Sequence, residues 1–134
     1  MNKQTVNIDG ACFTSLEEFF THFQSQALDA TWGRNLDAFN DVLRGGFGTP
    51  DGGFVLVWKN HLLSMKRLGY IETQRVLRAR LKTCHPSNVS SVQLDLSRAE
   101  RNEGGTVFDW LVEIIKDHGP GGSEQEDGVE LVLQ

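Results

Sequence analysis

The chain has 134 residues and a net charge of −5, and its 39% apolar and 23% charged residues are typical of a folded protein rather than a disordered one. This length fits a single domain, residues 1–134, with a hydrophobic core of its own. No apolar run reaches the ~20 residues of a membrane span, and no secretory signal opens the chain. Two cysteines are too few for a disulfide framework. We therefore expect a cytoplasmic protein without membrane contact.

The first predicted elements are a strand and a helix. Polar and apolar residues alternate over Thr5–Ile8, which predicts a short strand. Ser15 is followed three residues later by Glu18, a capping-box signature that marks the start of a helix. The phenylalanines and leucine after Ser15 form one apolar stripe, and we expect this helix to end near Ala27.

A second helix and a buried strand follow. The helix is predicted from about Asn35 to Arg44, because Leu36, Phe39 and Leu43 share one face and two glycines come next. The run Phe54–Trp58 is apolar at every position. A strand of this kind is typical of the centre of a parallel sheet, so we expect helices to cover both of its sides.

The middle of the chain is predicted to be helical and is basic. Residues 61–68 and 71–84 read as helices, the second ended by Pro86. Lysine and arginine predominate over residues 59–102, whereas acids predominate on either side. Such a middle could indicate nucleic-acid binding, but its charges alternate with apolar residues at helical spacing and no aromatic platform accompanies them. We therefore interpret it as a solvated helix face and expect no direct nucleic-acid contact.

The last third of the chain contains one ambiguous segment. Ser91–Arg101 fits either an alternating strand or a helix, and we take it as a helix. Thr106 precedes a helix over residues 107–118 whose apolar arc is so wide that two neighbours must cover it. Residues 119–128 are predicted to be a connecting loop and 129–134 a strand. Strands separated by helices predict an α/β domain with a parallel sheet.

The second helix carries Asp37 and Asp41 one turn apart, on a face that its core residues do not use. Two interpretations stay open. Arg34 and Arg44 each stand three residues from one of these acids, so the face could be a salt-bridge ladder of little consequence. Alternatively, paired carboxylates without metal ligands nearby indicate a surface that meets a cationic partner.

The order of residues around these acids resembles the barstar family of intracellular ribonuclease inhibitors. The matching residues precede a buried strand that ends in Trp58, and they are Gly33, Asn35, Leu36, Asp37, Ala38 and Asp41. The resemblance covers residues 5–69 and 106–134. It implies a barstar-like α/β fold, a small three-stranded parallel sheet packed by helices, with extra helices inserted at about 70–105. It also implies that the second helix and the loop beside it plug the active site of a secreted ribonuclease.

By this resemblance, an acid of the second helix takes the place of an RNA phosphate. The residues expected to touch the partner are Asp41 as the phosphate mimic, Asp37 and Glu113 as flanking acids, Asn35 and Thr31 as polar contacts, and Gly33 as part of the motif. Thr31 and Asn40 stand where barstar has aromatic contact residues, and Arg34 replaces an acid. These departures imply either a partner that differs from the familiar nuclease or a weak affinity for that nuclease.

We expect no enzyme activity, cofactor or metal site. The four histidines and two cysteines lack metal-ligand spacing, and no nucleophile with a base and an orienting group is visible. The glycines after His118 could cradle an anion, but acids follow them, which favours a connecting loop. The expected partner is a basic ribonuclease, secreted or delivered, bound one to one by a chain that is monomeric when free. The alternative, favoured by the mixed charge of Arg34 and Arg44, is an interaction or regulatory module without a nuclease partner.

Overall fold

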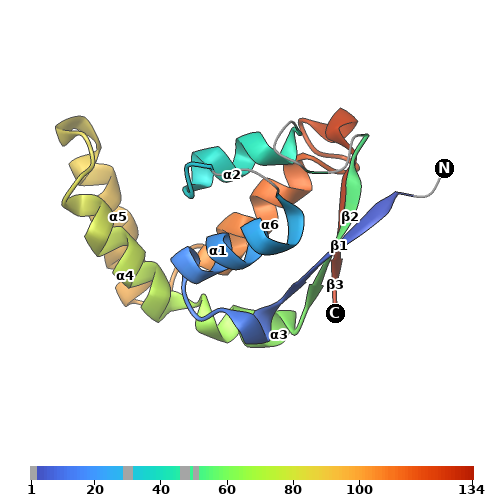
Figure 1. The fold of residues 1–134 in the computed structure, drawn as a ribbon. Helices are drawn as coiled ribbons and strands as arrows, with labels where there is room; N and C mark the ends of the chain where they lie inside the picture. The colour runs from blue at the N-terminus through green and yellow to red at the C-terminus, as the bar shows by residue number, and fades with distance from the viewer. Residues whose placement is uncertain (1–2, 29–31, 46–48, 50–51) are drawn as a thin grey trace.

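The computed structural model describes residues 3–28, 32–45, 49 and 52–134, which form a parallel sheet with helices packed against it (Figure 1). The strands lie in the order β1-β2-β3, with the bounds β1 Gln4–Asp9, β2 Phe54–Lys59 and β3 Val129–Leu133. The helices are α1 Leu16–Ala27, α2 Leu36–Leu43, α3 His61–Arg67, α4 Tyr70–Leu81, α5 Val89–Glu100 and α6 Val107–Asp117. The predicted α/β fold is confirmed, and the ambiguous segment at 91–101 is helical.

Local capping explains where the helices begin. The side chain of Asn35 accepts a hydrogen bond from the backbone N–H of Ala38 at 2.8 Å and so caps α2. Ser15 caps α1 by accepting from the N–H of Glu18. The predicted capping box at this helix is only half formed, because the Glu18 carboxylate accepts from the backbone N–H of Thr14 rather than from that of Ser15.

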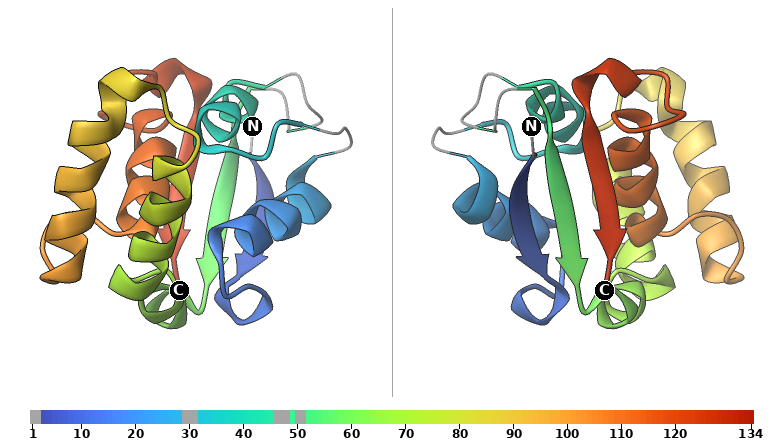
Figure 2. Two further views of the ribbon diagram at one scale, coloured as in Figure 1. Left: turned by 90° about the vertical axis from the view of Figure 1, so that its left-hand side faces the viewer. Right: turned by 90° about the vertical axis from the view of Figure 1, so that its right-hand side faces the viewer.

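The helices cover one face of the sheet only, as Figures 1 and 2 show, so the prediction of helices on both sides is wrong. Phe54, Leu56 and Trp58 of β2 are buried beneath the helices, whereas Val55 and Val57 point to the other face and are partly exposed. The strand order gives the physical reason. The connection from β1 to β2 and the connection from β2 to β3 both move in the same direction across the sheet. Because such connections are right-handed, their helices lie on the same side of the sheet.

The main core lies between the sheet and helices α1, α2 and α6. Trp58 is fully buried and stacks on Phe19 with ring centroids 5.4 Å apart, and Phe39 of α2 packs edge-on against the same phenylalanine. A smaller cluster joins α4 to α5, and Trp110 of α6 packs against both clusters. Because Phe39 is buried at the centre of this core, α2 is held at a defined position above the sheet.

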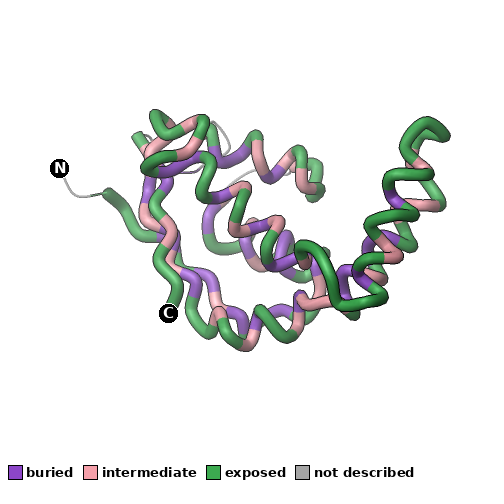
Figure 3. Tube along the Cα trace, turned by 180° about the vertical axis from the view of Figure 1, so that it is seen from behind, coloured by how far each residue is buried: buried purple, intermediate pink, exposed green. Residues whose placement is uncertain are grey.

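Helices α4 and α5 form a hairpin that projects from this body and is largely exposed (Figure 3). Its base is fixed by α4. The carboxylate of Glu72 accepts from the backbone N–H of Leu16 at 2.7 Å, and the hydroxyl of Thr73 accepts from that of Val107 at 2.9 Å. Helix α4 therefore caps the first turns of both α1 and α6. Among the helices described, none is both long enough and apolar enough to cross a membrane.

Candidate partner-binding site

Helix α2 presents a charged face to solvent. Asp37, Asp41 and Arg44 are exposed along this side, while Phe39 and its apolar neighbours on the opposite side are buried in the core. The two predicted acids therefore lie together on one accessible surface. Their position follows from the amphipathic pattern of the helix, whose apolar side decides which residues remain outside.

Asp41 shares a guanidinium with a distant acid. Arg44 donates to Asp41 at 3.0 Å and to Glu124 at 2.6 Å, and all three side chains keep substantial exposure. The hydrogen bond and charge of Glu124 raise the pKa of Arg44, with Asp41 adding to the effect. Since two carboxylates share one cation, the trio remains negative, and Asp41 keeps an oxygen for another donor. The predicted pair of Asp41 with Arg44 is confirmed.

Asp37 is arranged differently. Arg34, which could have paired with it, instead donates from Nε to the side-chain oxygen of Gln24 at 3.0 Å. Within the described part of the chain, no basic side chain lies at ion-pair distance from Asp37. The salt-bridge ladder therefore forms at one end of α2 and not at the other. Asp37 lines a groove of about 440 Å³ together with Asn35, Leu36 and Arg80 of α4.

The other predicted contact residues are less closely grouped. Glu113 lies on the exposed side of α6, the helix that packs against α2. Gly33 precedes the cap of α2, where a Cβ would come within 3.1 Å of the Ala38 methyl group, so glycine permits the close approach of the chain to the helix. Asn35 is the N-cap described above. Thr31 lies outside the described residues.

A buried histidine ties α2 to the segment before β3, a contact that the sequence pattern does not predict. His118 is fully buried; its Nδ1 lies 2.6 Å from Asp127 and its Nε2 lies 2.6 Å from the side-chain oxygen of Asn40. Both ring nitrogens face side-chain oxygens, so the ring bridges α2 to the segment before β3. Glu124 approaches the same ring at 3.5 Å. This network holds residues 124–127, the acidic loop, beside α2.

The ligand-type atoms of His118, Glu124 and Asp127 lie within 4.8 Å of one another, which is close enough to hold a metal ion. The donors around them argue for another interpretation. Glu124 already receives two hydrogen bonds from Arg44, and the His118 ring is hydrogen-bonded to Asp127 and Asn40. The atoms that would face a metal are already hydrogen-bonded within the protein, so the cluster is a hydrogen-bond network that shapes the surface next to Asp41.

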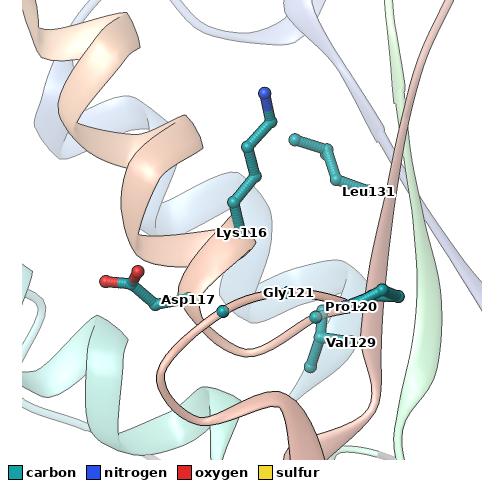
Figure 4. Close-up of a pocket in the computed structure, with 8 residues that line it drawn as sticks. Lys116, Asp117, Pro120, Gly121, Val129 and Leu131 are labelled. Carbon is teal, nitrogen blue, oxygen red and sulfur yellow. The ribbon is translucent and has the colours of Figure 1, made fainter.

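A hollow of about 430 Å³ between the end of α6 and β3 offers no comparable chemistry (Figure 4). Its glycine-rich wall bonds to itself: the N–H of Gly122 donates to the carbonyl of Gly119, and the N–H of Glu124 donates to that of Asp117. In Figure 4, Asp117 points away from Lys116. Because these amides are occupied, they cannot converge on an anion, which supports the prediction of a connecting loop.

Comparison with known proteins gives the family of the chain. No curated protein matched the chain. The family model described as barstar (barnase inhibitor) matches residues 3–83, which run from β1 to the end of α4 and include the motif with Asp37 and Asp41. Glu113 lies beyond the match, and residues 70–83 of the expected insertion lie within it. The match spans more than half of the chain, and the chain therefore belongs to the barstar family of barnase inhibitors.

Proposed function

We propose that this protein binds a basic ribonuclease, secreted or delivered, and blocks its active site with the acidic face of α2. The observation that carries the proposal is the exposed pair Asp37 and Asp41 on a helix whose other side is anchored in the core. Members of the barstar family are inhibitors rather than enzymes. The binding is one to one, in the cytoplasm of the cell that the inhibitor protects, by a chain that is monomeric when free.

Asp41 is the central residue of this proposal, the carboxylate that takes the place of an RNA phosphate. Asp37 and Glu113 flank it, Asn35 and Thr31 supply polar contacts, and Gly33 lets the chain approach closely. A carboxylate that meets guanidinium and ammonium groups in a closed interface forms charge-assisted hydrogen bonds. The same charges steer the encounter, so association slows as the salt concentration rises.

Arg44 opposes this contact, because it already donates to Asp41. An exposed pair of this kind contributes no more than about 1 kcal/mol, so cations of the partner can displace Arg44. We expect Asp41→Ala to weaken binding by about 2 kcal/mol or more, roughly thirtyfold. Arg44→Ala should strengthen binding or leave it unchanged, since it frees the carboxylate.

Co-expression with candidate secreted ribonucleases, scored by rescue of growth, identifies the partner. Dissociation constants for Asp41→Ala, Arg44→Ala and the control Glu130→Ala then test the site. Glu130 is an exposed acid on the uncovered face of the sheet, so its removal changes the net charge equally. Binding that is lost equally in Asp41→Ala and Glu130→Ala would remove Asp41 from the centre.

The second candidate is an interaction or regulatory module without a nuclease partner. The observation in its favour is Arg44, which places a positive charge in the middle of the acidic surface. A pull-down from lysate of the producing cell separates the two. A small basic ribonuclease among the bound proteins supports inhibition, whereas an enzyme of another class or a regulator supports the module.

A further inference from the structure

The groove beside Asp37 is built from two parts of the chain. Asn35, Leu36 and Asp37 at the start of α2 form one side, and Arg80 of the α4–α5 hairpin forms the other, around a volume of about 440 Å³. In Figure 1 the start of α2 is the end of this helix that faces the hairpin. The groove therefore continues the acidic face of α2 onto a basic helix.

Arg80 is held in place and presented to this groove. Its guanidinium carbon lies 5.6 Å from the ring centroid of Trp110, which is itself packed between the two hydrophobic clusters. The helix's other arginines, Arg75 and Arg78, pair with carboxylates of the protein. No carboxylate of the described residues lies at ion-pair distance from Arg80. A guanidinium that stacks on an aromatic ring, and whose N–H groups are not paired with a carboxylate, is preorganised to bind a carboxylate with two hydrogen bonds.

The two sides of the groove are fixed relative to each other. Helix α4 is fastened to the body through Glu72 and Thr73, which cap α1 and α6, and α2 is fastened through Phe39. A partner therefore meets Arg80 and Asp37 at a set spacing without first ordering the hairpin. Less ordering on binding leaves more of the contact energy as affinity.

Opposite charges in one groove define the occupant. A phosphate or a nucleic acid would meet the carboxylate of Asp37 as well as Arg80, which opposes its binding. We propose that the groove takes a loop of the ribonuclease that presents a carboxylate to Arg80, beside the basic group that meets Asp37. This proposal rests on the proposed function and gives the hairpin a role as a second arm of the binding surface.

A titration with a small probe tests the groove without the ribonuclease. ¹⁵N-labelled protein is titrated with acetyl-Gly-Glu-Gly-amide, and the signals of the Trp110 indole, the Arg80 Nε–H and the Asp37 amide are followed. We expect saturable shifts at these signals, and at least fivefold weaker binding for the glutamine peptide or for the Arg80→Gln variant. The Asp41→Asn variant should bind the peptide as the wild type does. Equal shifts with both peptides would overturn the proposal.

A second measurement relates the groove to the ribonuclease, with the ribonuclease identified by co-expression as the probe. We expect Arg80→Gln to weaken binding at least fivefold and Arg80→Lys to weaken it less, with the fold of each variant checked by circular dichroism. Weakening by Asp41→Asn but not by Arg80→Gln would overturn the role of the hairpin and leave the proposed function standing. Carboxylate-dependent peptide binding without ribonuclease binding would support the groove and count against the ribonuclease assignment.

Discussion

Glu72 fastens α4 to the body, so its removal should lower stability measurably. The side chain is 8% exposed, accepts from the N–H of Leu16 at 2.7 Å and receives two hydrogen bonds from Arg75 at 2.6 Å. Glu72→Ala leaves the first turn of α1 without this cap, which costs about 1 kcal/mol. Arg75 is 46% exposed and stays hydrated, so the lost ion pair adds roughly 1 kcal/mol rather than the full cost of a buried pair.

Together these losses amount to about 2 kcal/mol. In urea unfolding, with a slope of roughly 1.5 kcal/mol per molar for a protein of this size, the midpoint should fall by about 1.3 M. Glu72→Gln keeps an acceptor for Leu16 and should lose about half as much. Glu17→Ala is the matched control, because Glu17 also pairs with Arg75 but is exposed. A midpoint that moves no further in Glu72→Ala than in Glu17→Ala would refute the anchoring role.

Two further predictions concern histidines, the half-buried His22 and the buried His118. Nε2 of His22 accepts from the backbone N–H of Asp9, and burial lowers the pKa of His22 below its ordinary value of 6.5. The stability that neutral His22 contributes is therefore present above pH 6.5 and is lost as the pH falls through the folded-state pKa. Unfolding measured from pH 7.5 to 5 should show this loss, and a His22→Gln variant should show a flatter pH dependence. His118→Leu leaves Asn40 and Asp127 without their hydrogen-bond partner, so thermal unfolding should report a loss of about 2 kcal/mol or more. An unchanged melting temperature would contradict the network.

The helices and strands were predictable because their signals are local. The cap residue Asn35 and the apolar stripe of α2 settle where that helix begins and which side it buries. The layering was not predictable in this way. Val55 and Val57 are as apolar as their buried neighbours, yet they face the uncovered side of the sheet. A run of apolar residues shows that a strand is central without showing how many layers cover it.

The candidate site likewise has features that local sequence predicts and features that it does not. Asp37 and Asp41 were placed on one exposed face from helical spacing alone, and the structure agrees. The features that come from distant parts of the chain were missed. Arg44 meets Glu124 across 80 positions, and His118 meets Asn40 across 78, contacts for which no spacing rule exists. Pairing across the fold therefore decides the charge of the surface that α2 displays.

In the proposed complex the carboxylates of α2 occupy the place of RNA in the ribonuclease. Competition between the inhibitor and RNA tests this directly. The inhibition constant is determined, at increasing concentrations of RNA substrate, for the ribonuclease identified by co-expression. We expect the apparent inhibition constant to rise linearly with the RNA concentration, with kcat at saturating RNA unchanged, because one cleft cannot hold both ligands. An inhibition constant independent of the RNA concentration would show that the acidic helix binds elsewhere on the enzyme.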